Sequence, residues 1–192
     1  IKKNLMIKVL NKCKKFNIPV VIDEAYEGFY NFSYVTLLKK YKNLVITRTF
    51  SKSFGLAGFR AGYTVSSTKI SSLLNKYRPM YEINSIVCLA IEFLIKNYSI
   101  IKNHIKKVNE AKKYLKIQLN RLNIKYIDTY ANFFHIQIPK NKKKAVFEKD
   151  LMKNGILIRK GPEVKGFENY SRFSLGSKTQ MGKIIKIIKK NI

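Results

Sequence analysis

The chain has 192 residues, 46% of them hydrophobic, which is enough apolar material to bury a core in one large or two small domains. It holds no apolar run of membrane-spanning length, and lysines interrupt its first apolar residues, so neither a membrane span nor a signal peptide is expected. Cys13 and Cys88 are too few for a disulfide framework, and His104 and His135 lack the spacing of metal ligands. These features are typical of a soluble cytoplasmic protein without a metal.

The net charge of +28, from 39 Lys and Arg against 11 Asp and Glu, is the kind of charge that nucleic-acid binders carry. The lysines, however, are spread along the whole chain. They cluster only at 142–144 and in the C-terminal tail, and both clusters suit solvated helix faces. Together with the abundance of Asn and Ile, this distribution indicates a compositional bias rather than a nucleic-acid interface.

The first part of the chain alternates helical and strand patterns. The predicted elements are, in chain order, a helix over 4–16, a strand over 18–22, a short helix over 34–42, strands over 43–47 and 61–65, and a helix after the hydroxyl cluster 66–68 that ends before Pro79. Such alternation is typical of a doubly wound α/β layer. We therefore expect a first, α/β domain over residues 1–80.

After Pro79 the pattern changes to long helices followed by strands. The predicted elements are helices over 84–97 and 99–122, strands over 124–128 and 132–138, a helix over 142–153, strands over 155–159 and 171–175, and a last helix opened by a capping box at 177–180. This order predicts an α+β domain over residues 81–192. The last helix is basic and amphipathic, which also suits a membrane surface, but docking on its own sheet is the favoured arrangement.

Chemically distinctive residues follow two of the predicted strands. One apolar run ends in Asp23, and a second, over 44–47, leads into a glycine-rich turn that carries Lys52 and, eight residues later, Arg60. Ligands of open α/β sheets bind outside the carboxyl ends of the strands. Taken singly, an Asp after a strand is often a turn residue and a Ser-Lys pair is often solvated. Their combination predicts one shared site.

These residue types match the four groups that pyridoxal phosphate (PLP) presents to a protein. A lysine amine forms a Schiff base with the aldehyde, and a carboxylate keeps the ring nitrogen protonated. An arginine fork grips phosphate bidentately, and a hydroxyl adds a further donor. We therefore assign Lys52 to the aldehyde, Asp23 to the ring nitrogen and Tyr26 to the phenolic oxygen. Arg60 and Ser51 are assigned to the phosphate.

Four segments resemble the fold type I PLP aminotransferases (class I/II), and most closely their histidinol-phosphate aminotransferase branch. They are VIDEAY at 21–26, RTFSKSFGLAGFRAGY at 48–63, ANF at 131–133 and SRFSLGS at 171–177. The resemblance implies the C-terminal part of the PLP-binding large domain, a mostly parallel sheet with helices, over 1–80, and the small C-terminal domain over 81–192. The family's glycine-bearing phosphate loop and the aromatic residue that stacks on PLP precede these segments. The resemblance therefore covers the family's C-terminal half, and this chain alone is not expected to complete the cofactor site.

The resemblance also implies residues that recognise the substrate. Arg172 matches the arginine that binds the substrate's anionic group, a carboxylate or the phosphate of histidinol phosphate. Arg159 is a candidate for a second anion contact and equally for a surface charge at a strand end. Only six of the 39 basic residues are arginines, which favours a recognition role for those inside the matched segments. Asn132 is expected to have a structural role in a turn.

The activity implied is transamination between a small amino donor, phosphorylated or not, and a 2-oxo acid acceptor, in a cytoplasmic homodimer. Lys52, once displaced from the cofactor, would move the substrate's α-proton as a general base. Two alternatives stay open. Lys52 and Asp23 would equally serve a PLP-dependent phospho-amino-acid decarboxylase or an aminophosphonate transaminase. A non-catalytic basic fragment that binds nucleic acid is the other alternative.

Overall fold

The computed structural model describes residues 1–139, 143–158 and 165–192. The chain forms two compact units, Ile1–Ile101 and Lys102–Ile192, and each is described by itself. The predicted domain boundary between residues 80 and 81 stays a prediction. The units found here place the helix α3, Ser85–Lys96, with the first unit.

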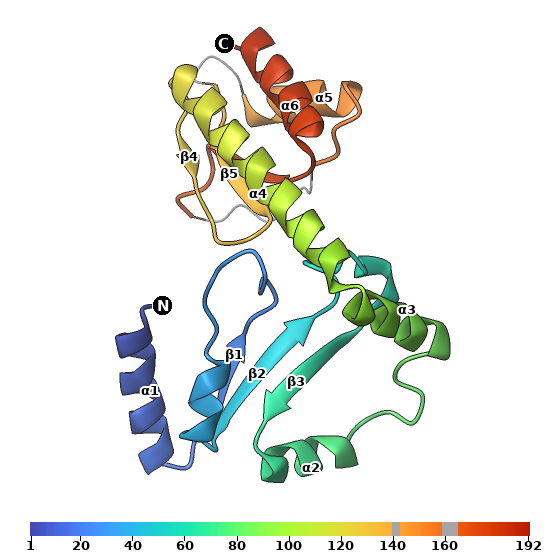
Figure 1. Cartoon of the computed structure of the whole chain (residues 1–192). Coiled ribbons are helices and arrows are strands. Elements are labelled where there is room, and N and C mark those ends of the chain that lie inside the picture. The colour runs from blue at the N-terminus through green and yellow to red at the C-terminus, as the bar shows by residue number, and fades with distance from the viewer. Residues whose placement is uncertain (140–142, 159–164) are drawn as a thin grey trace. The chain divides into compact units, whose positions relative to one another are not determined.

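The first unit is an α/β layer, as the alternating pattern predicts. In chain order its elements are α1 (Lys3–Lys15), β1 (Val20–Asp23), the 3-10 helix η1 (Val35–Lys39), β2 (Leu44–Thr49), the 3-10 turn η2 (Ala57–Phe59), β3 (Gly62–Ser66), α2 (Thr68–Lys76) and α3. Strand β2 lies in the middle of the sheet, parallel to β1 and antiparallel to β3 (Figure 1). The helix predicted over 34–42 is confirmed as a short element, but it is the tighter 3-10 form and ends at Lys39.

The core of this unit lies between α1, η1 and the first two strands. Leu10, Tyr41, Leu44 and Ile46 are almost completely buried in it, with Met6 on the same face of α1 as Leu10. Residues four apart on a helix share a face, which is why Met6 and Leu10 both point inward. This packing fixes the carboxyl ends of β1 and β2 relative to each other.

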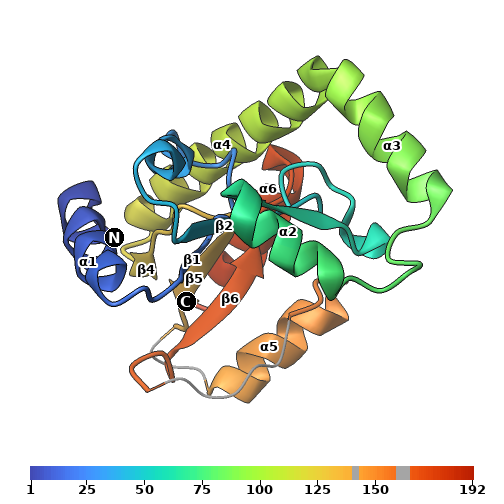
Figure 2. The ribbon, with the colours of Figure 1, turned by 90° about the horizontal axis from the view of Figure 1, so that it is seen from below.

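The second unit is an α+β layer. In chain order its elements are α4 (Tyr98–Arg121, whose first turn lies in the first unit), β4 (Tyr126–Ile127), β5 (Phe133–Gln137), α5 (Lys144–Lys153), β6 (Tyr170–Ser174) and α6 (Lys178–Lys190). The strands form an antiparallel sheet in the order β4-β5-β6, with α5 beside β6 (Figure 2).

Part of one predicted strand is wrong. The described residues of the 155–159 run form no strand, because Gly155 adopts a left-handed φ of +74° and turns the chain at the end of α5. The amide of Ile156 donates to the carbonyl of Leu151, so its bond closes the helix instead of entering the sheet. Residue 159 lies outside the described residues.

The last helix begins as predicted. The Ser177 hydroxyl accepts from the amide of Gln180, and the Gln180 side chain accepts from the amide of Ser177, which completes the capping box. Met181, Ile184 and Ile188 are buried on the inner face of α6, so the helix docks within its own unit. Among the described residues no helix is long and apolar enough to span a membrane.

Candidate cofactor and substrate site

Asp23 ends β1 at the edge where the neighbouring strand also ends. The parallel register pairs Asp23 with Thr47 of β2, so both strands deliver their following loops to one side of the sheet. One carboxylate oxygen, Oδ1, accepts a 2.9 Å hydrogen bond from the amide of Ala25. The side chain is otherwise solvent-exposed. Asp23 thus has the turn role common for an Asp after a strand, and it still offers its second oxygen to a ligand.

The loop that carries Lys52 is closed at both ends by backbone hydrogen bonds. The amide of Phe50 donates to the carbonyl of Ala61 over 3.1 Å, and the amide of Leu56 donates back to Phe50 over 3.0 Å. Gly55 adopts a left-handed φ of +73°, which lets its amide bond to the Lys52 carbonyl at the tip of the turn. Lys52, the residue predicted to bind the cofactor, is therefore half-buried in a turn that backbone hydrogen bonds hold in place.

The structure brings two of the predicted site residues into direct contact. The Lys52 ammonium nitrogen lies 5.5 Å from the centroid of the Tyr26 ring, within the range of a cation–π interaction. Tyr26 follows β1 and Lys52 follows β2. Side chains that follow two different strands therefore lie together, and their roles toward a cofactor stay a prediction.

The two residues assigned to phosphate lie in the same closed loop. Ser51 is half-buried, and its amide donates to the Thr49 hydroxyl over 3.0 Å. Arg60 is exposed, and its Nη1 donates to the Ala57 carbonyl over 3.0 Å. Its backbone has a left-handed φ of +53°, uncommon for a residue with a side chain. Such conformations gather at functional sites, where surrounding structure holds them.

An ion pair that the sequence does not reveal joins the two strand ends. Glu24, only 2% exposed, accepts from Nη2 of Arg48 over 2.9 Å and from its Nε over 3.1 Å. Arg48 lies in the matched segment 48–63, for whose arginines a recognition role is predicted, but its guanidinium is bound by the carboxylate of Glu24. Burial and then the Glu24 charge raise the pKa of Tyr30 to about 12. The only feature of the sequence that could have drawn attention to Glu24 is its position next to Asp23, and this position does not indicate that it pairs with Arg48.

In the second unit, Arg172 lies on β6 with its guanidinium carbon 4.2 Å from the Phe133 ring centroid. Strand register places it opposite His135. Burial, and then the Arg172 charge, hold the pKa of His135 below its usual value. Arg172 is exposed, as a substrate-binding cation would have to be. Arg159 lies outside the described residues, and its predicted role stays a prediction.

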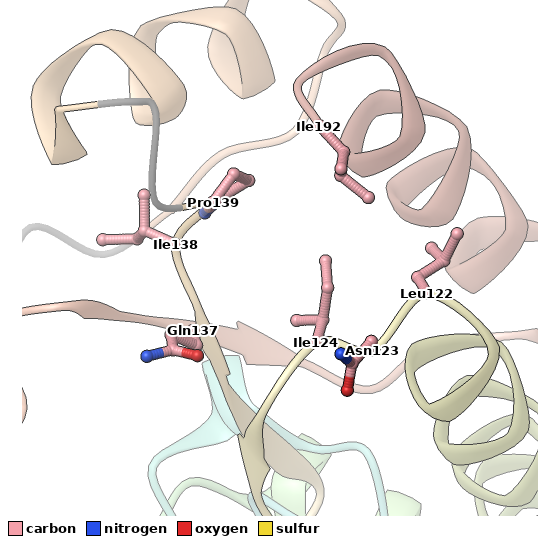
Figure 3. A pocket seen from close by; sticks show the side chains of 7 residues that line it. All are labelled: Leu122, Asn123, Ile124, Gln137, Ile138, Pro139 and Ile192. Atoms are coloured by element: carbon pink, nitrogen blue, oxygen red, sulfur yellow. The ribbon is translucent and has the colours of Figure 1, made fainter.

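A pocket of about 440 Å³ in the second unit holds none of the predicted site residues. Figure 3 shows its lining, which is mostly aliphatic: Leu122, Asn123, Ile124, Gln137, Ile138, Pro139 and Ile192. Asn123 and Gln137 are the only polar side chains among these, and neither is a nucleophile or a titratable group. The pocket therefore adds no chemistry to the site.

Comparison with known proteins points to one family. A sequence model of the family described as aminotransferase class I and II matches residues 2–188. Histidinol-phosphate aminotransferase 1 of Carboxydothermus hydrogenoformans is 33% identical over 181 residues, which cover 94% of this chain and 50% of that protein. The chain therefore spans about half the length of the relatives it matches.

Solved structures show the same fold. Histidinol-phosphate aminotransferase from Clostridium acetobutylicum matches with a TM-score of 0.88 at 24% identity, over 99% of this chain and 59% of that one. L-threonine-O-3-phosphate decarboxylase from Porphyromonas gingivalis matches with a TM-score of 0.81 at 20% identity, with the same coverage of both chains. At these identities the two matches establish a shared fold and leave the reaction open.

Proposed function

Because the chain belongs to the aminotransferase class I and II family, we propose that it supplies the lysine-bearing part of a PLP-dependent aminotransferase site. The observation that carries the proposal is the contact between Lys52 and Tyr26 at the carboxyl ends of β1 and β2. An amine and a phenol held together there suit the aldehyde and the neighbouring phenolic oxygen of one cofactor ring.

The other residues of the first unit fit the remaining groups of PLP. Asp23 offers an exposed carboxylate to the ring nitrogen, and Ser51 and Arg60 offer donors to the phosphate from one closed loop. When bound, PLP supplies an electron sink for the bonds at the substrate's α-carbon. Lys52 holds the cofactor and then carries the α-proton. Asp23 keeps the ring nitrogen protonated, and Arg60 orients the phosphate.

We propose Arg172, with Arg159 as a second contact, for the anionic group of the substrate. The guanidinium of Arg172 lies against Phe133, which restricts it to a narrow range of orientations, and its exposed edge stays available. An amino donor of the histidinol-phosphate type and a 2-oxo acid acceptor are the proposed substrates, since histidinol-phosphate aminotransferases are 30–36% identical to this chain.

We further propose a cytoplasmic homodimer. The helix α3 is apolar on most sides, yet Ile86, Leu89 and Phe93 are each more than half exposed. Apolar surface of this kind marks a site of association. Both cysteines, Cys13 and Cys88, are free thiols, as in reducing compartments.

The substrate assignment is tested by a donor screen on the protein in the full length in which it occurs. The protein is incubated with PLP, 2-oxoglutarate and single amino donors, among them histidinol phosphate, and the oxo product and carbon dioxide are both measured. We expect oxo product without carbon dioxide. Carbon dioxide release from a phosphorylated amino acid, which carries the carboxylate that histidinol phosphate lacks, would establish the decarboxylase alternative. Retention on nucleic acid that falls steeply with salt, without any PLP binding, would establish the basic-fragment alternative.

A further inference from the structure

We propose that Glu24 and Arg48 are a positioning pair that holds two segments of the cofactor site in one fixed arrangement. These are the end of β1 with the turn after it, here called the Asp23 arm, and the loop after β2, here called the Lys52 arm. The inference rests on the proposed function, because it gives the pair a role only if Asp23 and Lys52 bind PLP. Neither residue of the pair is proposed to touch the cofactor or the substrate. Their role is exerted through the residues next to them in the chain.

The composition makes the burial of this carboxylate informative. The chain has 11 acidic residues against 39 basic ones. Among the residues that the structure describes, Glu24 is the only buried acidic residue, at 2% exposure. A buried charge costs several kcal/mol unless it is paired and hydrogen-bonded.

The hydrogen bonds to the Glu24 carboxylate come from two separate parts of the chain, the segment 33–34 and Arg48. Its Oε1 accepts from the amide of Tyr34 over 2.7 Å, and both oxygens lie within 3.0 Å of the Ser33 hydroxyl. Its Oε2 accepts from two nitrogens of Arg48. Arg48 Nη2 also donates to Ser33 over 2.8 Å, so Ser33 bridges the pair. A carboxylate bonded on all sides is fixed in orientation as well as in charge.

The pair lies at the point where the two arms leave the sheet. Glu24 directly follows Asp23, and its amide donates to the carbonyl of Thr47, the residue before Arg48. Successive side chains of an extended chain point to opposite sides. With Glu24 buried, the side chain of Asp23 must face the other side, where it is exposed.

The Lys52 arm also begins at the ion pair. Arg48 precedes Lys52 by four residues, and the closed loop that carries Lys52 begins at Phe50, two residues after Arg48. Arg48 Nη1 reaches Tyr63 on β3 over 3.4 Å, so its guanidinium also ties the strand that returns from the loop. The Glu24–Arg48 pair therefore fixes the start of both arms, and the contact between Tyr26 and Lys52 depends on it.

The geometry requires arginine at position 48. Nε and Nη2 donate to one carboxylate oxygen while Nη1 points to Tyr63, and a single ammonium group cannot cover these directions. Arg78 offers a control, since it forms an ion pair with Glu82 in the connection between α2 and α3, and both side chains are more than 40% exposed. Exposed pairs contribute little to stability.

The test compares Arg48→Lys and Ser33→Ala with Arg78→Lys in the full-length protein. Three quantities are measured: PLP affinity, the pH midpoint of the visible absorbance of bound PLP, and reductive trapping of PLP on Lys52. We expect Arg48→Lys to trap PLP at Lys52 with an affinity lowered by about tenfold or more, the loss of one charge-assisted hydrogen bond. In Arg48→Lys the pH midpoint of the visible absorbance of bound PLP differs from that of the wild-type protein, because Asp23 and Lys52 are no longer held in place. Ser33→Ala gives a smaller change of the same sign, and Arg78→Lys gives none.

Ser33→Ala decides the matter if Arg48→Lys fails to fold, because it removes one bridge and leaves the ion pair intact. Wild-type affinity and an unshifted pH midpoint in the folded variants would overturn the positioning role while wild-type protein still traps PLP on Lys52. Absence of trapping in the wild-type protein would overturn the proposed function and this inference together. The two failures are therefore distinguishable.

Discussion

The ammonium nitrogen of Lys52 lies 5.5 Å from the centre of the Tyr26 ring, although the two residues follow different strands. A loop closed by the Phe50–Ala61 hydrogen bond presents the lysine, and the turn after Asp23 presents the tyrosine. Convergence of an amine and a phenol at adjacent strand ends is the geometric basis of the proposed cofactor site. The ring of Tyr26 can hold Lys52 by its face, while the hydroxyl serves a different partner.

This division of labour predicts the effect of Tyr26→Phe. Phenylalanine keeps the ring face under Lys52 and removes the hydroxyl assigned to the phenolic oxygen of PLP. We expect PLP affinity to fall by about tenfold, the value of one hydrogen bond to a charged group, with an unchanged melting temperature. Equilibrium titration with PLP measures it. Tyr77→Phe, at an 86% exposed position, is the matched control. Equal affinities for the two variants would refute the assignment of Tyr26.

Arg60→Gly separates stability from cofactor binding. The backbone of Arg60 has a φ of +53°, a conformation that glycine adopts without steric cost. We therefore expect the melting temperature to stay the same or to rise, while PLP is lost on dialysis because the phosphate loses its bidentate partner. Asn17→Gly is the control, since Asn17 has a φ of +54° and lies outside the site. Retention of PLP by Arg60→Gly to the same extent as by Asn17→Gly would contradict the phosphate role.

Gly62→Ala is expected to destabilise the sheet beside the site. A Cβ at position 62 would lie 2.6 Å from the backbone carbonyl oxygen of Arg48, so β3 would have to move away from β2. The expected loss is about 1–3 kcal/mol of unfolding free energy, as for other overpacked positions. Urea unfolding measures it. Gly58→Ala is the control, because a Cβ there meets no atom within 4 Å. Equal stability of both variants would show that the sheet yields at this point.

Arg172 is expected to control the titration of His135. Burial and then the positive charge of Arg172 lower the pKa of His135, so the folded state binds this proton at a lower pH than the unfolded state. The resulting stability is complete above the ordinary value of 6.5 and is lost as the pH falls from there toward the folded pKa. Arg172→Gln should raise the pKa of His135 toward 6.5 without reaching it, because burial remains.

Nuclear magnetic resonance of the imidazole protons follows this titration. The chain has two histidines, so a His104→Gln background leaves His135 as the only imidazole signal. A pKa of His135 that is the same with and without Arg172 would show that the two side chains are not coupled across the β5–β6 pair.

Much of the element order follows from local sequence patterns, because hydrophobic period and turn residues are local properties. The capping box at Ser177 and the strand ending in Asp23 are confirmed for this reason. The strand predicted over 155–159 fails in its described part, because the pattern of apolar residues does not reveal that Gly155 turns the chain first. Three-dimensional neighbours are harder still, since the sequence shows no reason for Glu24 to pair with Arg48 rather than with a lysine.

The site residues divide in the same way. Lys52, Asp23 and Arg60 are recognisable because motifs place them at strand ends and in a glycine-rich turn. The solvent exposure of an apolar side chain cannot be recognised from such motifs. Ile86 and Leu89 have the spacing of a core-facing helix and are nevertheless exposed, because the face they form has no partner among the described residues.

The central claim is that Lys52 holds the cofactor. Full-length protein is incubated with PLP, reduced with borohydride and digested, and the modified peptide is identified by mass spectrometry. We expect one phosphopyridoxyl group on Lys52, its loss in Lys52→Ala, and its retention in Lys69→Ala, a variant at an exposed lysine outside the site. Labelling spread over many lysines, or labelling and visible absorbance that persist in Lys52→Ala, would contradict the account.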